Sequence, residues 1–269
     1  MKCFKSWPRL LLVIIAIHCE ASPGIAQKPL TAPSDPQEAK ANQIVSDALE
    51  AMGGQNYLNV KTVIGRGQYT QFQDGVSGTP NSFVDYIVYP EKERTEFKGG
   101  RTHIIQTNSG ESGWVFDAST KSLKDLTRLQ IDDFKFTLRT SIENLLRGGW
   151  RKDGGKLSYV GRREAGVGRR NEVVRLTYAD GLLVEFEFGA KDHAPAKILY
   201  TKKSNTDAET AEEDRFAQFA NVSGVNAPFI VDHYVDGKQA SRINYQSLEF
   251  NASISQSIFA KPESVKGMK

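Results

Sequence analysis

A pair of strands near the C-terminal end constrains the fold of this 269-residue sequence more than any other feature. Between residues 229 and 236 the side chains alternate with the two-residue period of a β-strand, and both alternating sets contain bulky residues. Asp236 and Gly237 then supply the chemistry of a tight turn, and the chain returns as a second strand over 243–250. The segment therefore predicts an antiparallel hairpin.

Short strands of the same kind fill most of the chain from residue 62 onward. They are rich in β-branched and aromatic residues, are separated by Gly, Pro, Asn or Asp, and lie at 63–72, 82–89, 94–97, 102–107, 113–117, 157–160, 171–178, 182–188, 196–202 and 216–222. Strands so closely spaced pair antiparallel, because a parallel pair needs a long crossover. The acidic stretch 204–214 is expected to be a solvated loop, with a short helix as the alternative.

An N-terminal segment has the apolar spacing and the end signals of a helix. Asp35 is expected to cap it, Pro36 to occupy its first position and Glu38 to close a capping box. Apolar residues follow at three- and four-residue spacing as far as Met52, and the glycines at 53–54 end the pattern.

Residues 125–147 form a second helical segment, with mixed three- and four-residue apolar spacing that stops at Gly148 and Gly149. We expect one or two amphipathic helices here, the last over about 133–147. Together with the strands, these helices predict a mainly β (α+β) fold. Its core would be a single curved antiparallel sheet with helices on the concave face.

The first 26 residues have the three parts of a secretory signal. Basic residues precede an apolar run at 10–17, and small residues stand before a cleavage site after Ala26. An eight-residue run is too short for a bilayer, which takes roughly 20 helical residues. We therefore predict a cleaved signal peptide over 1–26. Lipidation at Cys19 is the alternative, which the bulky His18 before it disfavours.

Beyond the signal, the domain boundaries follow from composition and from the limits of the predicted elements. We expect a flexible linker over 27–34, a single folded domain over 35–262 and a C-terminal tail over 263–269. Both cysteines, Cys3 and Cys19, lie in the signal, so thiol catalysis, cysteine zinc sites and disulfides are excluded from the mature chain.

Charge and polar motifs favour neither nucleic-acid binding nor catalysis. The 35 basic and 32 acidic residues nearly balance, so no global field attracts nucleic acid. His103, His193 and His233 are too dispersed for a metal motif. Glu185 and Glu187 share a strand face as a glycosidase pair might, but the exposed face of an amphipathic strand is the preferred interpretation. We expect no catalytic residue, metal or cofactor.

Several predicted strands carry large apolar side chains on both faces, more than two helices can cover. Such an excess marks a candidate ligand groove. The side chains expected to line it are Tyr86, Val88, Trp114, Phe116, Phe134, Leu138, Ile142, Tyr178, Phe186, Phe188, Tyr200 and Phe229. Core packing is the alternative for the strand aromatics.

The C-terminal hairpin and its flanks resemble the closing pattern of the periplasmic outer-membrane lipoprotein carriers and lipoprotein-sorting proteins. A G-x-x-x-P step stands at 224–228, and the hairpin is followed by Asn251, Ile254, Ile258, Phe259 and Pro262. Segments 36–62 and 108–118 are also similar. The resemblance implies an unclosed half-barrel whose helices form a lid over a hydrophobic cavity for acyl chains.

The same resemblance implies a periplasmic, monomeric, non-catalytic protein. Its ligand would be a lipidated protein or a lipid, and it would work with an inner- or outer-membrane transport partner, without nucleic acid. The alternative is a periplasmic sensing or adaptor domain that reports mislocalised lipoprotein to a membrane partner, because half-barrels of this type also resemble envelope-stress regulators.

Two details of the resemblance concern the lid. In lipoprotein carriers an arginine before the proline of one strand contacts the lid, but the matching position here is Tyr89, before Pro90. This departure argues against lipoprotein hand-off, though not against hydrophobic binding. The lid residues are expected to cover the concave face beside Trp114 and Phe186, and they are Phe134, Leu138, Ile142 and Leu145.

Overall fold

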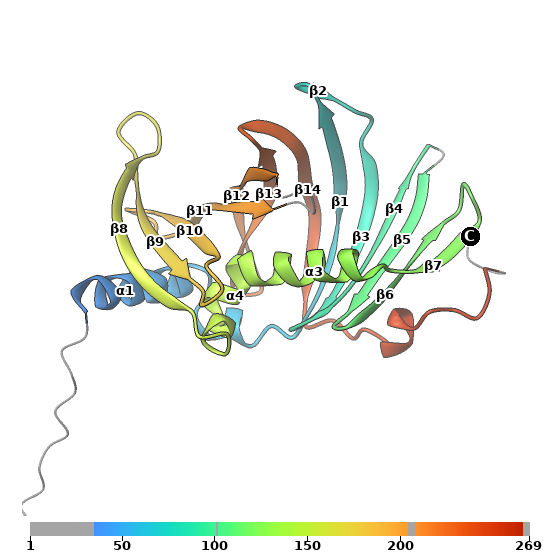
Figure 1. The fold of residues 1–269 in the computed structure, drawn as a ribbon, viewed down its shortest axis with the longest axis horizontal. Helices are drawn as coiled ribbons and strands as arrows, with labels where there is room; N and C mark the ends of the chain where they lie inside the picture. The colour runs from blue at the N-terminus through green and yellow to red at the C-terminus, as the bar shows by residue number, and fades with distance from the viewer. Residues whose placement is uncertain (1–34, 101, 204–207, 266–269) are drawn as a thin grey trace, which may run out of the picture. The chain divides into compact units, whose positions relative to one another are not determined.

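One antiparallel sheet of fourteen strands makes up most of the structure, a computed structural model that describes residues 35–100, 102–203 and 208–265 (Figure 1). The strands are β1 (Thr62–Gln73), β2 (Val76–Ser77), β3 (Asn81–Val88), β4 (Lys92–Gly99), β5 (Thr102–Ser109), β6 (Ser112–Asp117), β7 (Ser122–Asp125), β8 (Lys156–Glu164), β9 (Arg170–Thr177), β10 (Leu183–Gly189), β11 (Pro195–Lys203), β12 (Glu209–Val222), β13 (Val225–Val235) and β14 (Lys238–Phe250).

The order of the strands is β7-β6-β5-β4-β3-β1-β14-β13-β12-β11-β10-β9-β8, and β2 pairs only with β1. The pairing of β1 with β14 joins the N-terminal and C-terminal strands at the middle of the sheet. The end strands β7 and β8 do not pair with each other in this order, so the sheet is not closed. The predicted mainly β fold with a single open antiparallel sheet is confirmed.

Four helices accompany the sheet: α1 (Pro36–Ala51), α2 (Gln55–Leu58), α3 (Arg128–Thr140) and α4 (Ile142–Leu146), with 3-10 helices η1 (Gly149–Arg151) and η2 (Gln256–Phe259). The predicted N-cap Asp35 and the proline at the first position of α1 are confirmed, since the Asp35 side chain accepts a hydrogen bond from the Gln37 amide and Pro36 follows it. The predicted capping box with Glu38 is wrong, because Asp35 bonds to the second amide of the helix and not to that of Glu38. None of the helices within the described ranges is both long enough and apolar enough to span a membrane.

The expectation of a continuous helix over about 133–147 is wrong, because the segment breaks at Ser141. Ser141 has extended backbone angles, φ −71° and ψ 154°, and ends α3. Its hydroxyl then accepts a hydrogen bond from the Asn144 amide and so caps α4. A serine that caps the next helix interrupts the segment without the glycine or proline that would mark a break in the sequence.

The expectation of a loop over 204–214 is also wrong for its second part, because β12 begins at Glu209. Residues 204–207 lie outside the described residues. The acidic side chains of β12 pair with basic groups on neighbouring strands, as in Lys203–Glu209 at 3.1 Å and Lys197–Glu213 at 3.4 Å. Charge pairs with neighbouring strands therefore stabilise β12. The segment lacks the alternating apolar side chains from which a strand is predicted.

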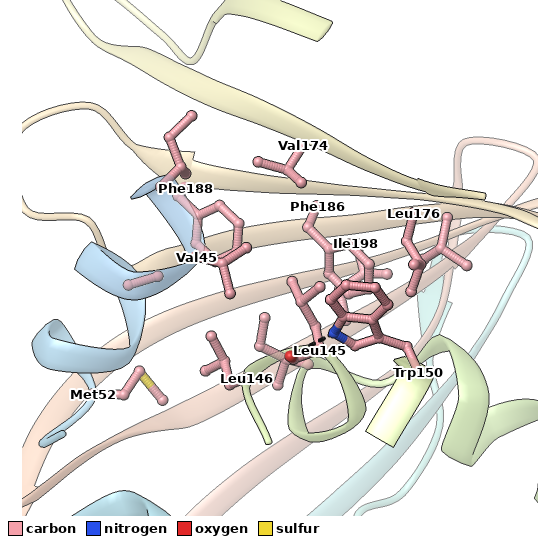
Figure 2. Packing of buried hydrophobic residues seen from close by; sticks show 14 of the residues in the cluster. Val45, Met52, Leu145, Leu146, Trp150, Val174, Leu176, Phe186, Phe188 and Ile198 are labelled. Carbon is pink, nitrogen blue, oxygen red and sulfur yellow. Dashed lines mark hydrogen bonds between the residues drawn. The ribbon is translucent and has the colours of Figure 1, made fainter. Parts of the chain in front are cut away.

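The main core lies between helices α1 and α4 and one face of strands β8 to β11, which we call the inner face of the sheet (Figure 2). Val45 of α1, Met52 directly after it, and Leu145 and Leu146 of α4 share this core with strand residues such as Phe186. Full burial of a side chain of this size stabilises a fold by about 1.5–3 kcal/mol. The Trp150 ring also donates a hydrogen bond of 3.1 Å to the Leu145 carbonyl and so fixes the end of α4.

A second, smaller core lies on the opposite, outer face of the sheet. Ile105, Trp114 and Phe116 are buried there beneath the C-terminal segment. The Trp114 ring donates to the Phe259 carbonyl at 2.9 Å, and the Arg94 guanidinium donates to the Ile258 carbonyl at 2.9 Å. The segment after β14 therefore covers the outer face of β4 to β6.

Candidate functional site

The inner face divides into a packed half and an open half. The packed half is the inner face of β8 to β11, which α1 and α4 cover. The open half is the rest of the inner face, on β1, β3, β4, β5, β13 and β14, apart from the ends of these strands that reach the main core through Val63 and Val225. Strand alternation and register bring apolar side chains to one surface there. These side chains are half-buried, except for the buried Phe83, and they are Tyr69, Phe83, Phe97, Ile104, Val231, Ile243 and Tyr245.

Helix α3 crosses the open half (Figure 1). At its start, Arg128 lies 3.6 Å from Glu111 in the turn between β5 and β6, and Lys135 in the middle of the helix also pairs with Glu111. Farther along, the Phe136 ring lies 5.5 Å from the Tyr200 ring of β11. Strands β4, β3, β1, β14, β13 and β12 separate these two attachment points in the sheet order, so α3 passes over all of them.

Contacts between α3 and the rest of the protein are loose. Of its residues, all of which are described, only Thr140 is buried, and Leu129 is 46% exposed. Ion pairs from Lys202 to Asp133 at 3.2 Å and from Arg139 to Asp180 at 2.8 Å add to the Lys135 pair. All of these pairs are substantially exposed, and exposed ion pairs add little stability. The helix is therefore held by few buried contacts.

Helix α4 is anchored much more firmly, through the arginine that follows it. The Arg147 guanidinium lies 5.0 Å from the Tyr57 ring and 4.1 Å from the Tyr89 ring. It also donates hydrogen bonds to three backbone carbonyls, at 3.0 Å to Tyr57, 3.3 Å to Leu58 and 3.0 Å to Val60. An arginine from the helical side thus contacts Tyr89, the position where lipoprotein carriers place an arginine on the sheet.

Carboxylic acids stand among the apolar groups of the open half. Burial raises the pKa of Asp85 well above its ordinary value, and the charge of Glu93 adds to this rise. Burial likewise raises the pKa of Glu93 and of Glu143 on α4. Neither Asp85 nor Glu93 forms an ion pair with another described residue, and the one side-chain hydroxyl that serves them belongs to Thr95.

His233 on β13 lies between two carboxylates of β12. Its Nε2 is 2.8 Å from Glu212, and its Nδ1 is 2.8 Å from Asp214. The hydrogen bond to Asp214, followed by the one to Glu212, raises the pKa of His233 from 6.5 to about 9. Both ring nitrogens are therefore engaged by acids. No group of three or more metal-ligating side chains is suitably placed in the described ranges.

The twelve residues predicted to line a groove do not form one surface. Tyr86, Val88, Trp114 and Phe116 face outward, as alternation along β3 and the Arg94–Thr107–Trp114 register require. The next four are buried in the packed half, namely Ile142, Tyr178, Phe186 and Phe188. The last four, Phe134, Leu138, Tyr200 and Phe229, are half-buried around α3 and on β13. Whether any of them binds ligand stays a prediction.

The contacts predicted for the lid residues are confirmed on one side and wrong on the other. Ile142 and Leu145 pack in the cluster that contains Phe186, as expected, but Trp114 lies on the outer face and cannot be covered from α3 or α4. On the outer face, Tyr86 instead lines a depression of about 150 Å³ with Arg94 and Ile258. The periodicity of each strand was correct, but which face turns inward depends on pairing between distant strands.

The prediction that Glu185 and Glu187 lie on an exposed strand face is wrong for Glu187, which is buried. Its carboxylate accepts a hydrogen bond of 2.8 Å from the Asn171 amide group. Glu185 pairs with Arg175 at 2.6 Å, and Arg163 pairs with both glutamates. Each acid is held by basic or amide groups of neighbouring strands, an arrangement that stabilises the sheet.

The residues predicted to line a groove do not include the open-half residues Tyr69, Phe83, Phe97, Ile104 and Tyr245. Tyr245 lies over β1 because Gly65 has no side chain there: a Cβ atom at Gly65 would lie 2.7 Å from the Tyr245 ring. The available signal was the alternation of Phe83 and Phe97 with polar neighbours, but alternation alone does not say which face is covered.

Comparison with known proteins identifies the fold. No family model and no curated protein matches the sequence. Among solved structures, a domain described as an outer membrane lipoprotein-sorting protein from Vibrio parahaemolyticus is similar with a TM-score of 0.54 and 12% identity. A LolA superfamily protein from Nitrosomonas europaea gives 0.54 and 15%, and a DUF1329 family protein from Desulfovibrio piger gives 0.56 and 10%.

Each of these three matches covers 82% of this chain and 97% of the other. At such identities the likeness shows the fold alone. The resemblance to the lipoprotein carrier and lipoprotein-sorting superfamily, predicted from the C-terminal hairpin, is confirmed at this level: the chain has the fold of a LolA superfamily protein and of a lipoprotein-sorting domain.

Proposed function

We propose that this protein is a non-catalytic periplasmic carrier or binder of lipoprotein acyl chains or other hydrophobic ligands, which it holds on the open half of the inner face beneath α3. One observation carries the proposal: a continuous surface of half-exposed aromatic and aliphatic side chains lies under a helix that buries only Thr140. Apolar surface left uncovered in this way is typical of a ligand site.

The energetics of such binding would be hydrophobic. Each methylene group that leaves water contributes about 0.8 kcal/mol, so a long acyl chain can displace the weak contacts of α3. Since Ser141 separates α3 from the anchored α4, we expect α3 alone to move during loading, with Ser141 as its hinge. The packed half would stay unchanged.

The likeness to a lipoprotein-sorting domain and to a LolA superfamily protein supports this proposal at the level of fold. A lipidated protein is the ligand that the resemblance implies, and a membrane transport partner would deliver or receive it. Tyr89 stands in place of the carriers' arginine, so hydrophobic binding is the part of the proposal that the residues of this chain support most directly.

Binding of a fluorescent fatty acid tests the proposal, with two matched variants. Phe97→Ala removes a half-buried aromatic side chain from the open half, and Tyr86→Ala removes one from the outer face of the adjoining strand. We expect Phe97→Ala to weaken binding about tenfold or more and Tyr86→Ala to leave it unchanged. Native mass spectrometry of protein purified without detergent should also detect bound lipid. No uptake and no co-purified lipid would contradict the proposal.

A further inference from the structure

Two carboxylic acids on the inner face lack the partners that buried acids ordinarily have. Asp85 on β3 is only 7% exposed, and it accepts a hydrogen bond of 2.9 Å from the Thr95 hydroxyl on β4. Glu93, two residues before Thr95, has its carboxylate 3.4 Å from the same hydroxyl. Glu93 is half-buried. Since a carboxylate removed from water without a basic partner is disfavoured, two such acids side by side call for an explanation.

A third acceptor faces the same place. Asn108 on β5 lies directly opposite Glu93 in the register and therefore on the inner face. It is 5% exposed, and its Oδ1 atom has no hydrogen-bond donor among the described residues. Buried polar atoms are almost always paired. The cluster of Asp85, Glu93 and Asn108, which we call the acceptor cluster, thus offers oxygen atoms in excess of the donors around it.

The acceptor cluster adjoins an aromatic surface. Within that surface the Phe83 ring lies 6.4 Å from Phe97 and 5.5 Å from Tyr245, and the Tyr69 ring lies 5.3 Å from Phe97. Phe83 is two residues before Asp85 on β3, a step of about 7 Å along a strand. A molecule that lies on these rings therefore reaches the acceptor cluster with its end.

We propose that the acceptor cluster binds the protonated amine of an amphiphile whose alkyl chain lies on the neighbouring aromatic rings. This inference rests on the proposed function and adds the head group that the site selects. An ammonium group carries one positive charge and three N–H donors, which match two carboxylates and an amide oxygen. A phosphate or carboxylate head group brings no N–H donor and would leave these acceptors unpaired.

The electrostatics agree with this assignment. Burial raises the pKa of both Asp85 and Glu93, so in the free protein each acid holds its proton more tightly than in water. An ammonium ion would favour their ionised forms, and its binding should therefore release protons. A bound metal ion is a poorer match, because no group of three or more metal-ligating side chains is suitably placed among the residues the structure describes.

Calorimetric titration of the mature protein with three twelve-carbon ligands tests the inference. The ligands are dodecylamine, dodecanol and dodecanoate, each below its micelle concentration. We expect dodecylamine to bind at least about tenfold more tightly than dodecanol or dodecanoate, a difference of about 1.4 kcal/mol. Repeating the titration in buffers of different ionisation enthalpy measures the expected proton release.

Two nearly isosteric variants, Asp85→Asn and Glu93→Gln, should abolish the preference for the amine while binding dodecanol as the native protein does. They should also unfold at an equal or higher temperature, since each removes an acid that has no basic partner, and this separates a binding role from a structural one. Glu249→Gln is the matched control, because Glu249 is exposed and pairs with Arg66 on the outer face.

The outcomes separate the two proposals. Equal affinity for all three ligands would overturn the head-group inference and leave the proposed function intact. Equal affinity is expected if the carboxylic acid of Glu93 keeps its proton and donates it to the Asn108 Oδ1 atom, because the cluster would then need no ligand. A preference for dodecylamine that persists in both variants would overturn the assignment to this cluster. Failure of every ligand to bind would contradict the proposed function itself.

Discussion

The two halves of the inner face are built from the same kind of strand but covered in different ways. On β8 to β11, Phe186 and Phe188 are almost completely buried beneath α1 and α4. On β3 and β4, the inner-facing side chains include half-exposed aromatics and unpaired acids beneath a loosely held α3. The difference indicates that one half maintains the fold, whereas the other half retains apolar surface that folding alone does not need.

This contrast should appear most strongly in stability. Phe186→Ala removes a fully buried ring from the packed half and should lower the free energy of unfolding by about 3–5 kcal/mol. Phe97→Ala in the open half should lower it by about 1 kcal/mol or less, because its ring is already half-exposed. Urea denaturation of both variants measures the difference. Equal losses would show that the open half is also a structural core.

The ion cluster of His233, Glu212 and Asp214 should make the free energy of unfolding depend on pH. The folded-state pKa of about 9 lies above the ordinary value of 6.5, so the stabilisation is fully present below about pH 6.5 and is lost as the pH rises through 9. The loss should be roughly 2 kcal/mol, since one pKa unit corresponds to about 1.4 kcal/mol and solvent screens part of it.

His233→Gln isolates this contribution from that of other titrating groups. Its free energy of unfolding should change less between pH 6.5 and 9 than that of the native protein, as measured by denaturation across this range. A pH profile identical to that of the native protein would mean that the contacts of His233 with Glu212 and Asp214 do not stabilise the fold.

A charge on the inner side of α3 should loosen this helix without unfolding the sheet. Leu138→Asp replaces a half-buried leucine of α3, so we expect faster amide exchange in α3, easier entry of a fluorescent fatty acid and a global stability lower by about 1 kcal/mol. The control is Leu145→Asp on the anchored α4, which should unfold the protein. Cooperative unfolding of the Leu138 variant as well would mean that α3 is part of the core.

The smallest effect concerns the ion pairs of α3. Lys202→Ala and Arg139→Ala each remove one ion pair. They also remove a cation–aromatic contact, of Lys202 with the Phe136 ring at 6.0 Å and of Arg139 with the Tyr178 ring at 4.3 Å, so each should cost about 1 kcal/mol. Raising the salt concentration from 0.05 to 0.5 M should speed exchange of the α3 amides in the native protein and have less effect in the variants. Exchange that is indifferent to salt would show that apolar contacts alone hold α3 in place.

Local chemistry was enough to predict a large part of the fold. The Asp236-Gly237 turn and the alternation around it fixed the C-terminal hairpin, and the capping residues at Asp35 and Pro36 fixed the start of α1. Strand β12 is not evident from the sequence, because it lacks apolar alternation and its glutamates pair with lysines of the neighbouring strand β11. The break at Ser141 escaped notice because a serine cap is a weak signal in a helical segment.

The candidate site was harder to predict than the fold. Each strand has two faces, and only the pairing of β1 with β14 decides that Phe83 and Tyr245 share one of them. For the same reason Trp114, a prominent aromatic residue in the sequence, turned out to lie under the C-terminal segment. Periodicity identifies the two sets of side chains in a strand, but long-range register determines which set is covered.

Photo-crosslinking tests the central claim most directly, because it reports where an alkyl chain lies. A fatty acid with a diazirine near its chain end is bound to the mature protein, irradiated, and its attachment sites are mapped by mass spectrometry. We predict labelling of the open half and of α3, at residues such as Tyr69, Phe97, Ile104 and Phe134. Labelling confined to the outer face around Tyr86 and Ile258, or no specific labelling at all, would contradict the account.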